Sequence, residues 1–311
     1  MSLAVGLDLR GFGSDSADLI HTVTAVEAAG FSFVTFTDSP LPADDGTPLV
    51  EAGTRAAFVA LHTDRLGLVP QLQVTTTEPF HLSTQLSTLD HLSAGRAGWW
   101  VGAVNDPAAL ATIGTTPRTQ AELHTELSEV VQVARLLWDS WEDDAAIRDT
   151  ASGRYLDADR VHHVNFVGST FSVVGPLITQ RSPQGQIVVL VEERHRLDAQ
   201  ADLVLLDDLD STTFADRSRQ VRQHAALPLA RIDLAEVPGA DELVSLIREI
   251  TAGGASGVLL RPRSLPHDLP VLADRVLPAL IDLALFRPPA AGATLRSTLG
   301  LGRPVNHFST R

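Results

Sequence analysis

Short apolar segments alternate with segments of helical periodicity along most of the chain, and this alternation restricts the possible folds. Most of the apolar segments are continuous hydrophobic runs, which are typical of parallel strands buried on both faces. They are Ala4–Leu9, Phe33–Thr37, Leu66–Val74, Gly98–Val104, Ile187–Val191, Ala201–Leu206, Leu229–Leu234 and Gly257–Leu260. Eight strand–helix units with short connections predict an α/β fold of the (β/α)8 barrel type. A doubly wound open sheet would give similar alternation, although it usually has fewer strands.

The predicted helices lie between these strands. In the longest of them, Arg118–Asp139, the apolar residues fall on one helical face. The predicted helices are Ser16–Ala29, Leu49–Leu61, Phe80–Leu92, Arg118–Asp139, Arg194–Gln200, Thr212–Ala225, Asp241–Ala252 and His267–Leu285.

The length of 311 residues fits one such barrel, so residues 1–311 are predicted to form a single domain. A polar segment at about 141–183 interrupts the alternation before the fifth strand. It contains two short strand-like pieces, Asn165–Val167 and Phe171–Val174, and is predicted to be an insertion packed on the barrel. The segment at about 287–311 is rich in proline and glycine and is predicted to be a tail along the barrel surface.

Composition excludes several classes of function. The formal net charge of −14 argues against nucleic acid or an anionic membrane as a partner, because both require a basic surface. The chain has no cysteine, which excludes disulfides and thiolate metal sites. Its histidines show no HxH or HExxH spacing, so no metal site is expected. We find no secretory signal and no apolar run of bilayer length, so a cytoplasmic protein is predicted.

The position of a loop relative to its strand indicates its role, because (β/α)8 barrels carry their active sites on the loops that follow strands. The segment LDHLSAGRAG precedes the fourth strand, so His91 and Arg96 are predicted to hydrogen-bond backbone at a tight turn. A second group is predicted to anchor the insertion by packing and ion pairs. Its members are Trp138, Trp141, Glu142, Asp143 and Asp144.

Three segments resemble the luciferase-like flavin-dependent monooxygenases, in the branch of nitrilotriacetate and dibenzothiophene-sulfone monooxygenases. They are LDHLSAGRAGWW (Leu89–Trp100), LWDSWEDDA (Leu137–Ala145) and TLRSTLGLGRP (Thr294–Pro304), in that family's order. The resemblance implies a (β/α)8 barrel of the luciferase-like type. It also implies FMN as cofactor, a separate flavin reductase that supplies reduced flavin, a small organic substrate oxidised with O2, and a homodimer.

The resemblance also implies a set of flavin-site residues. Asp38 matches the acidic residue that ends the family's second strand, and Thr76 and Thr77 match its Ser/Thr-rich segment beside the flavin. Trp100 would form a wall of the site, and Arg118 begins the helix that opens with Arg-Tyr in the family. The resemblance does not identify a catalytic residue.

Several family positions differ in this chain. Trp100 replaces a flavin-contacting asparagine, and Thr119 replaces the tyrosine after Arg118. The Ser/Gly-rich loop that cradles the flavin phosphate becomes VEERHRLDAQAD, in which Glu192 and Glu193 would repel a phosphate. Arg261 and Arg263, after the eighth strand, would either bind the phosphate instead or pair with neighbouring acids, and the second interpretation is favoured.

Three functions are therefore compatible with the sequence. The first is an FMN-dependent monooxygenase, with a barrel that uses a deazaflavin as a close variant. The second is a non-catalytic paralogue that has lost the flavin site and serves as a partner subunit or binds a small ligand. The third is a hydrolase with a pair of carboxylates. Its candidate residues are Glu192, Glu193, Asp207, Asp208 and Asp210.

Overall fold

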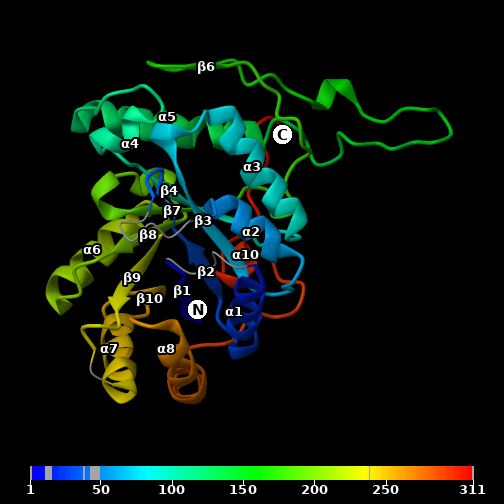
Figure 1. Ribbon diagram of the computed structural model, residues 1–311. Helices are drawn as coiled ribbons and strands as arrows, with labels where there is room; N and C mark the ends of the chain where they lie inside the picture. Colours follow the sequence, from blue (N-terminus) through cyan, green and yellow to red (C-terminus); the bar gives the residue numbers. More distant parts are fainter. Residues whose placement is uncertain (1, 11–15, 38, 43–49, 238, 310–311) are drawn as a thin grey trace.

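Eight parallel strands close into a barrel in the computed structural model of the chain, with helices around the outside (Figure 1). The structure describes residues 2–10, 16–37, 39–42, 50–237 and 239–309. The barrel strands are β1 (Ala4–Asp8), β2 (Phe33–Phe36), β3 (Gly67–Gln73), β4 (Gly98–Gly102), β7 (Val188–Glu192), β8 (Leu203–Leu206), β9 (Leu227–Asp233) and β10 (Gly257–Arg261). Their order around the barrel is β1-β10-β9-β8-β7-β4-β3-β2, which confirms the predicted (β/α)8 barrel and excludes an open sheet.

Every second residue of the strands points into the barrel lumen, as the two-residue period of a strand requires. Phe33, Val69 and Trp100 belong to one buried apolar cluster there, together with leucines of the later strands. Gly6 on β1 leaves room for this packing, because a Cβ at that position would lie 2.3 Å from the Phe33 ring. The lumen is therefore a packed core and not a pore.

The helices match most of the predicted segments. They are α1 (Ser16–Ala29), α2 (Ala52–Ala60), α3 (Pro79–Leu92), α4 (Pro107–Ala111), α5 (Gln120–Trp138), α6 (Ser211–Gln223), α7 (Ala240–Ala252), α8 (Leu265–Val271), α9 (Leu277–Asp282) and α10 (Leu295–Thr298). The short helix α4 was not predicted. The helix expected at His267–Leu285 is divided, because a π-helical turn, Leu272–Val276, joins α8 to α9.

The predicted helix Arg194–Gln200 is wrong. This segment forms two 3₁₀ turns, η3 (Glu193–His195) and η4 (Asp198–Gln200). Arg196 lies between them in the left-handed conformation, with φ of 54°. A left-handed residue cannot continue an α-helix, so the chain turns here after β7.

The turn before β4 is held by two buried charged residues. The Arg96 guanidinium donates hydrogen bonds to the backbone oxygens of Ser93, Leu66, Ala60 and Thr63. Asp90 accepts a hydrogen bond from the Ala97 N–H at 3.0 Å. His91 Nε2 lies 3.0 Å from the Gln180 carbonyl oxygen. The structural role predicted for His91 and Arg96 is therefore confirmed.

The C-terminal segment closes the amino-terminal end of the barrel. Leu295 at the start of α10 and Leu299 just after it are 1% and 4% exposed and join the apolar cluster of the lumen. Arg296 binds Asp202 at 2.9 Å, just before β8. The segment TLRSTLGLGRP therefore belongs to the stable end of the barrel, away from the loops that follow the strands.

The insertion is anchored at its base and projects at its far end. Trp141 Nε1 donates to the Leu177 carbonyl oxygen at 2.8 Å, and Asp143 binds Arg181 at 2.8 Å. The two predicted strand-like pieces form an antiparallel hairpin of β5 (Phe166–Val167) and β6 (Ser172–Val173). The hairpin packs on the barrel, since Val173 is buried in the core cluster and the Ser169 N–H donates to Glu129 of α5 at 2.8 Å. The loop before the hairpin extends beyond the barrel helices (Figure 1).

Candidate functional site

Charged side chains form a layer inside the carboxyl-terminal ends of the strands. Arg261 lies 3.5 Å from Asp8 and 3.7 Å from Asp233. Arg231 contacts Glu192 at 3.7 Å and Asp207 at 2.5 Å. We call this group the ion-pair layer; its members are Asp8, Glu192, Asp207, Arg231, Asp233 and Arg261. It covers the apolar lumen on the side of the barrel where related folds carry their active sites.

Asp8 is the most deeply buried member of the ion-pair layer. Its side chain is inaccessible to solvent, and burial raises the pKa of its carboxyl group, although Arg10, Thr35 and Arg261 oppose that shift. Thr35 donates a hydrogen bond to Asp8 Oδ1 at 3.0 Å. The other oxygen, Oδ2, has no hydrogen-bond partner among the described residues. The guanidinium groups of Arg10 and Arg261, at 3.9 and 3.5 Å, compensate the charge of this oxygen.

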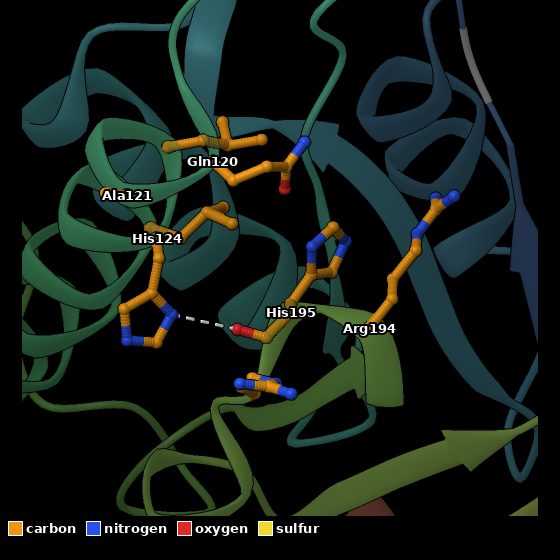
Figure 2. A pocket seen from close by; sticks show the side chains of 8 residues that line it. Gln120, Ala121, His124, Arg194 and His195 are labelled. Atoms are coloured by element: carbon orange, nitrogen blue, oxygen red, sulfur yellow. Dashed lines mark hydrogen bonds between the residues drawn. The ribbon is translucent and has the colours of Figure 1, made fainter.

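A cavity of about 470 Å³ lies between the turn after β7 and the first half of α5. We call it the basic pocket. It is lined by Gln120, Ala121, Leu123, His124, Leu127, Arg194, His195 and Arg196. Figure 2 shows side chains of α5 on one side of it and the η3 turn on the other. Two arginines and two histidines on a loop that follows a strand and on the facing helix give this pocket the chemistry of an anion site.

The two histidines of the basic pocket have different roles. His124 Nδ1 donates a hydrogen bond to the His195 carbonyl oxygen at 3.1 Å, and this bond ties α5 to η3 (Figure 2). Burial and the nearby Arg194 lower the pKa of the His195 imidazole to about 4. His195 is therefore uncharged at neutral pH, and the arginines supply the positive charge of the pocket.

The two arginines also differ. Arg194 Nε lies 2.5 Å from Glu192, so part of its charge is already compensated. Arg196 forms no ion pair and no side-chain hydrogen bond with any residue that the structure describes. Its left-handed backbone lets the side chain line the basic pocket. Arg196 is therefore the cation best placed to receive an anionic ligand.

The predicted repulsion between the Glu192–Glu193 pair and a phosphate is weakened by ion pairs. Glu192 contacts Arg231 within the ion-pair layer, and Glu193 pairs with Arg217 on α6. Neither glutamate lines the basic pocket. The pocket was not predicted from the sequence, because the two glutamates suggested repulsion of a phosphate and hid the meaning of the Arg-His-Arg run that follows them.

The residues predicted to bind flavin occupy separate places. Thr76 and Thr77 line a second cavity of about 280 Å³ at the end of β3. Trp100 is 1% exposed within the lumen core, and its Nε1 has no hydrogen-bond partner among the described residues. Arg118 pairs with Glu126 at 2.5 Å beside a third cavity. Asp38 lies outside the described residues. Flavin contacts for these residues remain predictions.

Thr119, which replaces the family's tyrosine, has a clear structural role. Its hydroxyl accepts a hydrogen bond from the Glu122 N–H at 3.3 Å, and Glu122 accepts one from the Thr119 N–H at 2.8 Å. This reciprocal pair is a capping box, which stabilises the start of a helix. Thr119 therefore fixes the beginning of α5 directly beside the basic pocket.

The other predicted charges are engaged in pairs. Arg261 belongs to the ion-pair layer, and Arg263 pairs with Asp268 at 3.3 Å. The favoured interpretation, that these arginines pair with neighbouring acids, is thus confirmed. Asp210 caps α6, and hydrogen bonds from Thr213 and Thr212 lower the pKa of its carboxyl group. A hydrolase needs one carboxyl group with a raised pKa, so these contacts give no support to that hypothesis.

Within the described part of the chain, no three histidine or carboxylate side chains lie close enough to hold a metal ion. The described helices also include none with the length and apolar character needed to cross a bilayer.

Comparison with known proteins gives the family. A family model described as luciferase-like monooxygenase matches residues 6–205. Over 307 residues the chain is 35% identical to one subunit of the pristinamycin IIA synthase of Streptomyces pristinaespiralis, and the match covers 99% of this chain and 97% of that protein. This chain belongs to the luciferase-like monooxygenase family.

Other relatives match a shorter part of the chain. Nitrilotriacetate monooxygenase component A of Aminobacter aminovorans is 35% identical over 143 residues, which are 46% of this chain and 32% of that protein. The second subunit of the same Streptomyces synthase is 32% identical over 136 residues, which are 43% of this chain and 28% of that protein. A solved structure agrees in fold: riboflavin lyase, crystallised with modified FMN and riboflavin, superposes with a TM-score of 0.84 at 19% identity and covers 96% of both chains.

Proposed function

We propose that this chain binds FMN and works as a reduced-flavin-dependent monooxygenase on a small organic substrate, with a separate reductase that supplies reduced flavin. The observation that carries the proposal is the basic pocket at the end of β7, in a chain of the luciferase-like monooxygenase family. When bound, reduced FMN would supply two electrons to O2, so that one oxygen atom would enter the substrate and the other would leave as water. The protein would position the cofactor and keep water from it.

The donor set of the basic pocket fits the phosphate group of FMN. Arg196 offers an uncompensated guanidinium, whose geometry suits phosphate oxygens. His195 has a lowered pKa and remains neutral, so it can hydrogen-bond without adding charge. The pocket volume of about 470 Å³ exceeds what a phosphate group alone requires.

The strand order suggests where the flavin ring would lie. The basic pocket is at the end of β7, the cavity of Thr76 and Thr77 is at the end of β3, and β4 lies between these two strands. A cofactor with its phosphate at Arg196 would therefore extend over β4 toward the threonines. Hydroxyl groups at that end could hydrogen-bond the polar edge of the ring.

Titration of the purified protein with FMN and with riboflavin tests this proposal. We expect micromolar binding of FMN and at least about tenfold weaker binding of riboflavin, because a charged hydrogen bond contributes about 1.5–3 kcal/mol. Arg196→Ala should weaken FMN binding about tenfold or more and leave riboflavin binding unchanged. Arg219→Ala, which removes an exposed arginine from α6, is the matched control. Absence of FMN binding at about 1 mM would overturn the proposal.

A second candidate function is that of a flavin-free partner in a two-chain monooxygenase. Its support is that the relative matched along nearly its whole length is one subunit of a synthase, and that a second subunit of that synthase matches this chain too. The burial of Asp8 and Glu192 in the ion-pair layer also restricts access to the lumen. This candidate predicts no binding of FMN or riboflavin by the isolated chain, so the same titration separates the two functions.

A further inference from the structure

A further cavity, of about 240 Å³, lies beside the carboxyl-terminal ends of β9 and β10. Helix α7 forms one side of it, and α8 with the π-helical turn Leu272–Val276 forms the other. The π-helical turn packs against α7, and Figure 1 shows α7 and α8 on the same side of the barrel. Strand β8 separates β9 from β7, so this cavity is distinct from the basic pocket. We call it the α7–α8 groove; its lining includes Leu243, Arg263, Asp268, Val271, Arg275 and Val276.

The floor of the α7–α8 groove is apolar. Leu243, Leu272 and Val276 line it and are buried, and Val271 is 42% exposed at its rim. The described residues that line the groove include no aromatic side chain. An apolar lining with a few polar groups is the usual composition of a small-molecule site. The volume is below the about 300–1,000 Å³ typical of drug-sized ligands, so the groove suits a short aliphatic chain.

The π-helical turn gives a local reason for this cavity. It widens the helix between α8 and α9, and Leu272, Arg275 and Val276 of the turn all line the groove. Pro278 follows the turn, and a proline inside a helix cannot donate a hydrogen bond to the carbonyl four residues before it. Turns of this kind are rare and occur frequently at functional sites.

Two arginines with spare hydrogen-bond donors border the α7–α8 groove. Arg275 Nη2 lies 3.1 Å from Asp241, and the two side chains are 59% and 87% exposed. An ion pair so open to water contributes little, so a ligand can replace it. Arg263 Nη2 lies 3.3 Å from Asp268, whose Oδ2 already accepts hydrogen bonds from the N–H groups of Arg263 and Ser264. Each guanidinium therefore keeps donors for a ligand.

We infer that the α7–α8 groove is a second ligand site and binds a short aliphatic carboxylate. Two arginines and one aspartate line it, which gives a local charge of +1 in a chain of net charge −14. A single carboxylate matches this charge, whereas a phosphate dianion would exceed it beside Asp268. Guanidinium groups bind carboxylates through paired hydrogen bonds. The aliphatic chain gains free energy when it is buried against Leu243 and Val276.

Calorimetric titration with octanoate, in the absence of flavin, tests the inference. We expect a dissociation constant below about 1 mM. Octylammonium, which has the same chain and the opposite charge, should bind at least about tenfold more weakly.

Two substitutions place the ligand in the groove. Val271→Trp should abolish octanoate binding, because the indole fills the space between α7 and α8. Ile281→Trp is its matched control, since Ile281 is 43% exposed on α9 and does not line the groove. Arg275→Gln should weaken octanoate binding about fivefold or more through loss of a charged hydrogen bond. Its control is Arg248→Gln, which changes an exposed arginine of α7 outside the groove.

Arg196→Ala separates this site from the basic pocket. It should leave octanoate binding unchanged, and Arg275→Gln should leave FMN binding unchanged. Loss of octanoate binding in Arg196→Ala would overturn the inference, because the ligand would then lie in the basic pocket. Absence of octanoate binding at about 5 mM, equal binding of octylammonium, or binding that neither Val271→Trp nor Arg275→Gln weakens would overturn it too. Circular dichroism checks that each variant is folded. A chain that binds no FMN is expected to give the same octanoate results.

Discussion

Two arginines illustrate how burial decides the role of a residue. Arg96 is 4% exposed, and its guanidinium is bound to backbone oxygens on several sides. A buried charge without such partners would be costly, so the Arg96 guanidinium stays bound to these oxygens and stabilises the turn. Arg196 lines a cavity and has no ionic partner among the described residues, which leaves its charge available to a ligand.

His195 gives a prediction about pH. Its pKa in the folded protein is about 4, below the ordinary value of 6.5, so the unfolded chain takes up a proton first as the pH falls. The titration of His195 therefore has no effect on stability well above pH 6.5 and becomes destabilising as the pH falls from 6.5 to 4. Across that interval the free energy of unfolding should decrease by about 3 kcal/mol because of this residue.

Urea unfolding at several pH values measures this effect. His195→Gln should lose less stability than the parent between pH 6.5 and 4, since glutamine does not titrate. His21→Gln removes an exposed histidine from α1 and serves as control. Equal pH dependence in the parent and in His195→Gln would contradict the prediction.

At the scale of elements, short segments far from the strands complete the barrel. Helix α10 lies close to the end of the chain, yet Leu295 and Leu299 fill the amino-terminal end of the lumen. The Leu295 N–H also donates to the Gly95 carbonyl oxygen at 2.8 Å, which joins α10 to the turn before β4. Two of the segments that resemble the family are thus joined at the stable end of the barrel.

Leu295→Ala should lower the free energy of unfolding by about 2–5 kcal/mol, because it opens a cavity in a packed core. The measurement is chemical denaturation at pH 7. Leu283→Ala, at a position 44% exposed after α9, should cost less than about 1 kcal/mol. A similar small cost for Leu295→Ala would show that α10 does not seal the barrel.

At the scale of the whole molecule, the acidic excess acts against compactness. The net charge is −14, so the excess carboxylates repel one another, and this repulsion is greatest at low ionic strength. The Debye length falls from about 30 Å at 0.01 M salt to less than about 10 Å above 0.1 M. Exposed charges on opposite sides of the barrel therefore interact much less in moderate salt.

The thermal unfolding midpoint at pH 7 should rise by a few degrees when NaCl is increased from about 10 to 200 mM, since screening weakens this repulsion. Differential scanning calorimetry measures it, with sucrose at equal osmolality as the control for non-ionic effects. A lower midpoint in salt would instead mean that ion pairs, such as those of the ion-pair layer, dominate the electrostatic stability.

Much of the barrel could be predicted because a strand buried on both faces has a local signature. Strand ends were predicted to within two residues, and helix α1 was predicted at its observed bounds. The segment Arg194–Gln200 was mispredicted because the left-handed Arg196 is fixed by surrounding structure and not by helix propensity. The basic pocket was missed for a related reason, since its two sides come from segments about 70 residues apart.

By itself the sequence determined the alternation of strands and helices, the family and the structural role of the turn at Arg96, because each depends on neighbouring residues or on a recognisable motif. Only the tertiary structure decided which charges are paired, that Glu193 is paired with Arg217, and that Arg196 faces a cavity. Such outcomes depend on distances between segments remote in the chain, and those distances exist only once the barrel has closed.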